Sequence, residues 1–293
     1  MRLGTRRSAL ALAQAREVAE LIGAAELVPM STRGDRDSHS GVEDKSRWVA
    51  DIEDALLRGE IDIAVHSAKD VPARLPDGLM LLGTPTRGPA EDVLCGAAGV
   101  DALAPGARVG TSSLRRAAQL RAARDDIDVV AMRGSVDTRL AKLAEGEVDA
   151  LVLARAGLER LGREAEIGAV LDPHRFVPAP GQGIVVLEGR EDNPRAVDTG
   201  AAVGDLDTFA CLLQERGLAA ALAADCDTPL GAHCVVDPDA GLVLRGWAGL
   251  PDGSEWLVDE LVGPRNQRDV LAVQVAERMR AVGVEQLLTR ARA

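Results

Sequence analysis

The sequence predicts an α/β protein with two lobes and a smaller C-terminal α+β domain. Short apolar runs of strand length alternate with helical patterns, as is typical of βαβ units and a largely parallel sheet. Glycine- and proline-rich breaks at residues 83–89 and 178–183 resemble crossings between two lobes. From about residue 205 the pattern changes to β-like runs separated by turns. A chain of 293 residues is long enough for about two or three domains.

The alternating part begins with a very short first strand and an amphipathic helix at residues 9–22. The run at 61–66 (IDIAVH) is rich in β-branched residues and follows Gly59-Glu60, as expected of a buried strand. Further strands are predicted at residues 79–84, 129–133, 151–154 and 184–187, and further helices at residues 48–58, 114–123 and 136–145.

The C-terminal part begins with an Ala- and Leu-rich helix expected at residues 205–223. Three β-like runs follow at 234–237, 241–248 and 255–262, separated by Pro-Asp-Ala-Gly and Pro-Asp-Gly turns. Two such turns predict an antiparallel meander. An amphipathic helix expected at 266–282 closes the chain, so this part is predicted to be a separate α+β domain.

The composition excludes several classes of function. Acidic residues outnumber basic ones by 46 to 34, which gives a net charge of −12. This charge argues against an indiscriminate nucleic-acid binder and against adhesion to an anionic membrane. The chain has no Tyr and only 2% aromatic residues, so stacking platforms for single-stranded nucleic acid are not expected.

The compartment is predicted to be the cytoplasm. No apolar segment follows the basic N-terminal residues, and no apolar stretch approaches about 18 residues, so neither a signal peptide nor a membrane span is expected. The four cysteines, at 95, 211, 226 and 234, are scattered and are expected to be reduced. Cys226 falls in a turn, where a thiol is accessible as a nucleophile or as an attachment point. The alternative is that it is a small buried hydrophobic residue, which is the role expected of Cys95 and Cys211.

Basic and hydroxyl side chains gather at three predicted strand-to-helix turns, at residues 5–8, 110–116 and 133–139. Helix N-termini bind anions through free N–H groups, and arginine forms bidentate bonds with carboxylates. Taken singly, each turn could be a helix cap beside solvated arginines. Taken together, they predict a cleft for a polyanion with spaced carboxylates or phosphates.

Residues 66–72 (HSAKDVP) follow the predicted buried strand directly. Open α/β sheets bind ligands at the carboxyl ends of their strands. Four polar or ionisable side chains at such a turn therefore predict a site, and a polar loop with a local Lys69–Asp70 pair is the alternative.

Other catalytic and metal motifs are absent from the sequence. There is no P-loop motif and no GxSxG, and Gly181-Gln182-Gly183 precedes a strand instead of following one, so a Rossmann fingerprint is rejected. Cys226, His233 and Cys234 lack a fourth ligand at standard spacing, so no metal site is expected.

A set of segments resembles one enzyme family. The segments TRRSALALAQ, HSAKDVP, GTSSLRRAAQL, RGSVDTRL, AGLERLG, PAPGQG and ER-x9-C-x2-P occur in that order. Together they resemble the porphobilinogen deaminase (hydroxymethylbilane synthase) family over about residues 2–290. The resemblance implies two lobes like those of type II periplasmic binding proteins and a C-terminal domain with a three-stranded antiparallel sheet. Domain 1 would comprise residues 1–84 and 184–203, domain 2 residues 88–178, and domain 3 residues 205–293.

The resemblance also implies a reaction. Enzymes of the family are transferases that condense four porphobilinogen molecules head to tail, release ammonia each time, and hydrolyse off a linear tetrapyrrole of porphyrin and heme biosynthesis. They extend the chain on a dipyrromethane cofactor linked through a thioether to a cysteine that matches Cys226. The substrate porphobilinogen is then the expected partner, with no nucleic acid and no membrane, and the family suggests a monomer.

Site residues follow from the family motifs. The implied catalytic residues are Asp70, Lys69 and Arg6, with Asp70 hydrogen bonding pyrrole N–H groups, stabilising positive charge and helping to move protons. The implied cofactor-binding residues are Cys226 (covalently), Ser67, Lys69, Asp70, Thr111, Ser112, Ser113, Arg115, Arg116, Arg133 and Ser135. The implied substrate-binding residues are Arg6, Ser8, Gln14, Lys45, Arg133, Arg139, Arg160 and Gln182.

Some positions depart from the family pattern. The family commonly has Asn where Ser135 stands, Gly-Gly where Ala224-Asp225 stand, and Lys where Ala50 stands. The segment 36–47, which matches the family's active-site lid, is shortened, and Lys45 matches the lid lysine. None of these departures removes Asp70 or Cys226.

Two other classes of function are weighed against an active synthase. A non-catalytic module that binds carboxylate ligands on the same fold would need neither Asp70 nor Cys226, and both are present. A metal-dependent enzyme is disfavoured because the histidines are not clustered.

Overall fold

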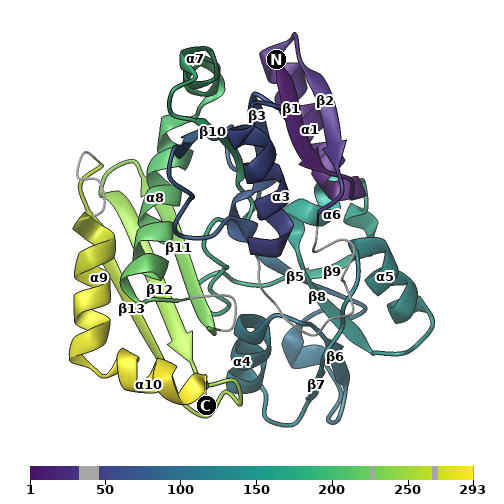
Figure 1. Cartoon of the computed structure of the whole chain (residues 1–293). Helices are drawn as coiled ribbons and strands as arrows, with labels where there is room; N and C mark the ends of the chain where they lie inside the picture. The colour runs from purple at the N-terminus through teal and green to yellow at the C-terminus, as the bar shows by residue number, and fades with distance from the viewer. Residues whose placement is uncertain (33–45, 225–227, 266–269, 293) are drawn as a thin grey trace. The chain divides into compact units, whose positions relative to one another are not determined.

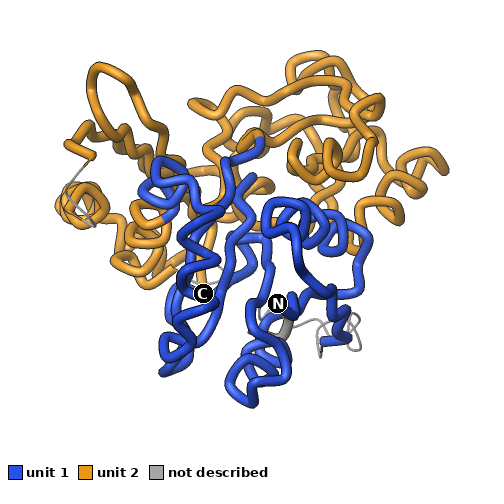
Figure 2. Tube along the Cα trace, turned by 90° about the horizontal axis from the view of Figure 1, so that it is seen from above, with its two compact units in different colours: residues 1–88, 183–212 blue, residues 89–182, 213–293 orange. Residues whose placement is uncertain are grey.

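The computed structural model describes residues 1–32, 46–224, 228–265 and 270–292. The chain forms two compact units, unit 1 with residues 1–88 and 183–212 and unit 2 with residues 89–182 and 213–293 (Figure 2). The chain passes between the units within the glycine- and proline-rich segments 83–89 and 178–183, and again inside a helix at residues 212–213.

Unit 1 contains a five-stranded sheet in the order β2-β1-β3-β10-β4 (Figure 1). Its strands are β1 (Arg2–Arg6), β2 (Glu26–Met30), β3 (Ile63–Ser67), β4 (Leu79–Gly83) and β10 (Val185–Arg190). The strands β2, β1 and β3 are parallel, whereas β10 runs antiparallel to both β3 and β4. The sheet is therefore mixed, because β10 enters from the second crossing segment and not through a βαβ connection.

Helices cover both faces of this sheet. They are α1 (Ala9–Ile22), α3 (Ser46–Leu57), α7 (Pro194–Val203) and the start of α8 (Leu206–Ala221). Side chains of α1 and α7 pack with Val65 and Leu187 on one face, while those of α3 pack with Ala64 on the other. The central strands β3 and β10 are buried on both faces, which explains why they read as continuous apolar runs in the sequence.

Unit 2 repeats the same plan in its first part. Its five-stranded sheet has the order β7-β6-β8-β5-β9, again with three parallel strands followed by antiparallel ones. The strands are β5 (Asp92–Cys95), β6 (Arg108–Gly110), β7 (Asp128–Val130), β8 (Ala150–Ala154) and β9 (Ile167–Val170). The helices are α4 (Leu114–Ala123), α5 (Val136–Ala144) and α6 (Arg155–Arg160), with short 3-10 turns η2 (Val100–Ala102) and η3 (Glu164–Glu166). The matching strand order confirms the predicted pair of α/β sheets.

The rest of unit 2 is built on a three-stranded antiparallel sheet, as predicted. It consists of β11 (Leu230–Asp237), β12 (Gly241–Gly249) and β13 (Trp256–Gly263), paired in chain order. The helices α9 (Val270–Ala281) and α10 (Val284–Ala291) pack against this meander (Figure 1).

The predicted helices at 9–22 and 114–123 match α1 and α4 in both bounds. The sequence did not predict β2, β5, β9, α6, α7 or α10. The missed strands have only four or five residues, and an aspartate begins β5 while a proline and a glycine interrupt β2 and β9. Such residues weaken the strand pattern, and pairing with neighbouring strands compensates for them.

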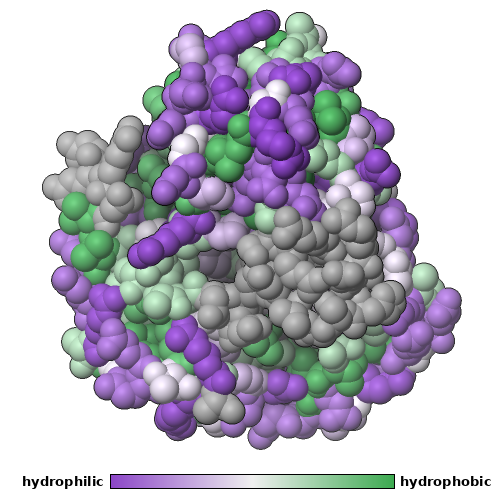
Figure 3. Space-filling model, viewed as in Figure 1, coloured by the Kyte–Doolittle hydropathy of each residue, from purple (hydrophilic) through white to green (hydrophobic). Residues whose placement is uncertain are grey.

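The surface gives no sign of a membrane-spanning segment in the described part of the chain. Among the described helices, none combines the length and the apolar character that a membrane span requires. On the face drawn in Figure 3, hydrophobic side chains form small groups among hydrophilic ones.

Candidate functional site

The carboxylate expected to be catalytic lies on a short turn at the end of β3. The 3-10 turn η1 (Ala68–Asp70) follows Ser67, the last residue of that strand. The Ala68 N–H donates to the Ile184 carbonyl at 2.9 Å, and the Ala68 side chain is buried. This anchoring leaves the side chains of Lys69 and Asp70 half-buried at the carboxyl end of β3, as the sequence predicted.

Asp70 lines a pocket of unit 1 together with polar residues from β1, α1 and β3. The polar residues lining it are Arg6, Ser8, Gln14, His66, Ser67 and Asp70. Apolar side chains, among them Val49 and Val65, complete the wall. The structure thus brings five of the predicted site residues together, and it adds His66, which was not among them. A half-buried carboxylate beside a guanidinium, hydroxyls and an amide suits a ligand that carries both N–H groups and carboxylates.

The turn between β6 and α4 is organised by its own hydroxyls. Thr111 is buried, and its Oγ1 accepts a hydrogen bond from the Ser113 N–H at 3.1 Å. Ser113 caps α4, with its Oγ accepting from the Arg116 N–H at 3.4 Å. Ser112 is half-buried between them. The predicted hydroxyl-rich helix start is therefore present in unit 2.

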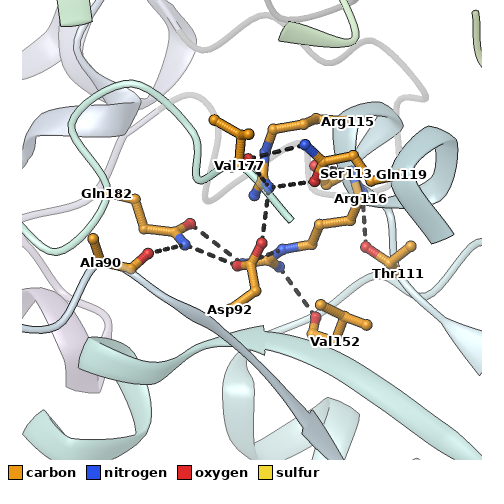
Figure 4. Close-up of polar contacts among 10 residues, drawn as sticks. All are labelled: Ala90, Asp92, Thr111, Ser113, Arg115, Arg116, Gln119, Val152, Val177 and Gln182. Atoms are coloured by element: carbon orange, nitrogen blue, oxygen red, sulfur yellow. Dashed lines mark hydrogen bonds and ion pairs between the residues drawn. The ribbon is translucent and has the colours of Figure 1, made fainter. Parts of the chain in front are cut away.

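The two arginines of this turn point inward, to Asp92 at the start of β5 (Figure 4). Asp92 is 1% exposed, and its Oδ2 accepts from Arg115 Nη1 at 2.8 Å. Its Oδ1 accepts from Arg116 Nη2 at 2.7 Å and from Arg116 Nε at 3.0 Å. Both arginines are themselves buried, at 4% and 7% exposure. These guanidiniums are thus committed to a buried ion pair.

Gln182 completes this network within unit 2. It is fully buried, and its Nε2 donates to the Ala90 carbonyl at 2.7 Å and to Asp92 Oδ1 at 2.8 Å. Burial alone would raise the pKa of Asp92, but the charges and hydrogen bonds of Arg115 and Arg116 outweigh it and hold the pKa well below its ordinary value. Asp92 therefore remains ionised.

The turn between β7 and α5 is more open. Ser135 caps α5, with its Oγ accepting from the Thr138 N–H at 3.2 Å, and Arg139 Nε donates to the Gly134 carbonyl at 2.9 Å. Gly134 has φ 121°, and a Cβ there would meet the Thr138 side chain at 2.9 Å, so glycine is required. Arg133 is exposed beside it. A helix start with an exposed arginine is suited to anions.

Three predicted site residues remain, and the structure describes one of them. Arg160 is half-buried at the end of α6. Lys45, with most of the shortened segment 36–47, and Cys226 lie outside the described residues. The other thiols, those of Cys95, Cys211 and Cys234, are reduced and buried, and this burial confirms the role expected of the first two. Burial raises the pKa of the Cys95 thiol to about 11, so it stays protonated.

Sequence reasoning missed three buried ionisable groups, Glu53, Asp92 and Glu188, whereas it predicted His66 as part of the polar turn at residues 66–72. A signal exists for two of them. Glu53 occupies the apolar stripe of α3, between Ile52 and Leu56, and Glu188 interrupts the apolar run of β10. A charged residue at a core position of an otherwise apolar pattern is worth examining.

Metal ligands do not gather in the described part of the chain. There, no group of three or more His, Cys, Asp or Glu side chains is placed to hold a metal ion.

The fold and the site define an α/β protein with a carboxylate-bearing pocket and basic, hydroxyl-capped turns. The family model "Porphobilinogen deaminase, dipyromethane cofactor binding domain" matches residues 1–198. Curated relatives include porphobilinogen deaminases of Deinococcus deserti, 41% identical over 99% of this chain and 98% of that protein, and of Stenotrophomonas maltophilia R551-3, 43% identical over 98% of each. The chain belongs to the porphobilinogen deaminase family.

The solved structures to which the chain is similar include that of the methionine binding protein MetQ, 15% identical with a TM-score of 0.43, over 71% of this chain and 91% of that one. The Bordetella pertussis BvgS periplasmic VFT2 domain is 14% identical with a TM-score of 0.42, over 69% of this chain and 86% of that one. The assignment of two similar sheets rests on their strand order.

The residues present fit the dipyrromethane cofactor of the family. Three helix starts carry hydroxyl caps, at Ser8, Ser113 and Ser135, and Arg133 is exposed beside the last of them. These donors suit the carboxylates of a pyrrole chain. Asp70 in its pocket supplies the acceptor that pyrrole N–H groups need.

Proposed function

We propose that this chain is an active hydroxymethylbilane synthase, a transferase that condenses four porphobilinogen molecules with release of ammonia and then releases the linear tetrapyrrole by hydrolysis. The observation that carries this proposal is the pocket of unit 1, in which Asp70 lies with Arg6, Ser8, Gln14 and Ser67. The family assignment over nearly the whole chain supports it.

The cofactor of this activity is dipyrromethane, attached in our proposal through Cys226. When bound, it supplies the pyrrole to which the first substrate is joined. The family model covers the cofactor-binding domain, and burial of the three other cysteines supports Cys226 as the attachment point. A buried, protonated thiol is a poor nucleophile.

The chain's own residues would do the chemistry in stages. Arg6, Ser8 and Gln14 would bind the substrate carboxylates beside Asp70, with Lys69 and Ser67 on the same turn. Asp70 would accept hydrogen bonds from pyrrole N–H groups, which places a negative charge where positive charge develops as ammonia leaves. The same carboxylate would accept the proton that a pyrrole carbon loses after the new C–C bond forms.

The residues of unit 2 and the lid would hold the growing chain. Arg133, Arg139, Arg160 and Lys45 are proposed to bind substrate units, and Thr111, Ser112, Ser113 and Ser135 the cofactor. Gln182, which the sequence also placed in the substrate set, is fully buried and bonded to Asp92, so its role would be to hold that carboxylate. Arg115 and Arg116 stay in the cofactor set. Asp92 fixes both guanidiniums in place, and the two arginines and Asp92 together carry one net positive charge. This rigid group would attract the carboxylates of the cofactor through that charge.

Other expectations stay predictions beside this proposal. The division into domains 1–84 with 184–203, 88–178 and 205–293 is one of them. The monomeric state and the cytoplasmic location are two more. The non-catalytic binding module is not favoured, because the relatives that match nearly the whole chain are all named as the enzyme.

Intact mass under denaturing conditions tests the proposal. Protein made in a host that produces porphobilinogen should carry an adduct equal to two linked porphobilinogen units. Cys226→Ser should lack the adduct, while Cys211→Ser, the matched control at a buried thiol, should keep it. An unmodified mass of the wild-type protein would overturn the proposal.

A further inference from the structure

Three ionisable side chains meet in the core of unit 1, behind the pocket. They are Glu53 on α3, His66 on β3 and Glu188 on β10, exposed by 6%, 5% and 0%. His66 Nε2 lies 3.3 Å from Glu188 Oε2. The register of β3 and β10 places Glu188 opposite Ala64, on the same face as His66 and toward α3. Strand pairing therefore holds this cluster in place.

The cluster is poorly satisfied. Within the described part of the chain, Glu53 Oε1, both carboxylate oxygens of Glu188 and His66 Nε2 are buried without a hydrogen-bond partner. Buried charges without hydrogen bonds are costly, so such groups neutralise where they can. Of the two carboxyl groups, only that of Glu188 lies opposite the His66 imidazole, at 3.3 Å. The other carboxyl group is most stable as the neutral acid.

Glu53 is the carboxyl group that takes the proton. Burial, and then the charge of Glu188, raise the pKa of Glu53 to about 7, against an opposing effect of His66. His66 faces Glu188 at 3.3 Å and is the natural partner of that carboxylate. Near neutral pH, Glu53 thus sits at the midpoint of its titration.

The cluster adjoins the pocket through His66, which lines it together with Asp70 and Arg6. His66 precedes Asp70 by four residues, and the Val186–His66 pairing lies next to the bond from Ala68 N–H to the Ile184 carbonyl that anchors η1. The helix that carries Glu53 also packs against η1. A change in the charge of the cluster is thereby passed to the turn that carries Asp70.

We propose that Glu53 is a positioning residue for the reaction: as a neutral acid it keeps the His66–Glu188 pair in place beneath the Asp70 turn, and its ionisation disables the turn. This inference rests on the proposed synthase activity. Ionised Glu53 would lie beside ionised Glu188 in a buried space, and repulsion between like charges would displace His66 from the pocket wall.

The charged groups around Glu53 come from its own helix and from the elements that pack against that helix. His66 on β3 and Glu188 on β10 act on it most strongly, and Asp54 on α3 raises its pKa slightly. The other elements packed against α3 are β1, with Arg2 and Arg6, and η1, with Lys69 and Asp70.

The first test is the pH dependence of kcat and KM for porphobilinogen in the holoenzyme. We expect wild-type kcat to fall as the pH rises through about 7, with little change in KM. Glu53→Ala should lower kcat at every pH. Glu53→Gln, which imitates the protonated acid, should restore kcat at pH 6 and move the alkaline limb upward by about one pH unit or more. Asp54→Asn is the control at a half-buried residue of the same helix, and because Asp54 has the smallest effect on the pKa of Glu53, it should leave the limb close to that of the wild type.

A second measurement does not depend on turnover. The imidazole signal of His66 in the NMR spectrum, assigned with His66→Gln, should report the ionisation of Glu53 as a step near pH 7 that is absent in Glu53→Gln. The inference would be overturned if wild type and Glu53→Gln showed the same alkaline limb and the same change of the His66 signal with pH. A wild-type protein that carries the adduct but does not consume porphobilinogen would instead overturn the proposed function.

Discussion

Each of the two units buries a cluster of ionisable groups, and the clusters differ in how well they are satisfied. In unit 2, Asp92 accepts hydrogen bonds from Arg115, Arg116 and Gln182. In unit 1, Glu53 and Glu188 bury oxygens that form no hydrogen bond among the described residues. A fully bonded carboxylate has one stable charge state, whereas a poorly bonded one can change its protonation near neutral pH. The cluster of unit 2 is therefore suited to stabilising the fold, and the cluster of unit 1 is suited to controlling the site through its protonation.

Asp70 is the half-buried carboxylate of the pocket, in contrast to those of the two buried clusters, and its replacement should give the largest effect on activity. Asp70→Asn removes the charge from the pocket but keeps the shape of the side chain. We expect turnover to fall by about 100-fold or more, with unchanged stability, because a half-buried residue on a turn adds little to the core. Porphobilinogen consumption and urea unfolding measure the two quantities.

Asp77→Asn is the control for that experiment, because Asp77 is exposed seven residues further along the same unit. It should leave both quantities unchanged. Near-normal consumption by Asp70→Asn would show that the catalytic assignment is wrong.

The cluster of unit 2 should give the largest effect on stability. Asp92→Asn leaves two buried guanidiniums without their carboxylate, which we expect to cost about 3–5 kcal/mol in the free energy of unfolding. The pKa of Asp92 is well below its ordinary value, so its contribution is present at every pH above the unfolded pKa and is lost only in strong acid.

Urea unfolding at pH 7 measures this loss. The matched control is Asp126→Asn, which breaks the exposed pair with Arg124 and should leave the unfolding midpoint unchanged. Equal midpoints for Asp92→Asn and Asp126→Asn would show that the buried network does not stabilise unit 2.

The cluster of unit 1 should give a smaller effect, and one with the opposite dependence on pH. The pKa of Glu53 is raised from 4.5 to about 7, so between these values the folded chain binds a proton that the unfolded chain does not. Stability should then fall as the pH rises from about 4.5 to about 7, by roughly 3 kcal/mol at most. Glu53→Gln removes this slope and should be more stable than wild type at pH 8. Unfolding free energies at pH 5, 6, 7 and 8 provide the test, and parallel curves for the two proteins would contradict it.

The fold could be predicted where the local pattern and the packing agree. The helix over 9–22 and the meander after 230 were predicted because a helical stripe and two turns mark them in the sequence. The antiparallel course of β10 could not be predicted, since its apolar run is the same in either direction.

The residues of the site that follow a strand in the sequence could be predicted, whereas the contacts that the sheet creates could not. Asp70 and the serine caps follow strands directly, and that position is visible in the sequence. The partners of Arg115 and Arg116 were not visible, because Asp92 lies 23 and 24 residues away and only the sheet brings them together. In the sequence, the turn at residues 110–116 therefore resembled a ligand site, although both of its arginines bond to Asp92 within the protein.

The smallest expected effect concerns the open turn of unit 2, which contrasts with both buried clusters. Ser135 caps α5 at the surface, with its Oγ 3.2 Å from the Thr138 N–H and 2.9 Å from the Thr138 hydroxyl. Ser135→Ala should cost about 1 kcal/mol in the free energy of unfolding, since a helix N–H loses its acceptor. Ser135→Asn, which carries the residue common in the family, should restore the cap and hence the stability. Urea unfolding separates the two variants, and a loss that is equal for Ala and Asn would show that the hydroxyl does not stabilise α5 as a cap. If Asn restores stability but lowers turnover, the Ser135 hydroxyl acts on the bound chain as well as on the helix.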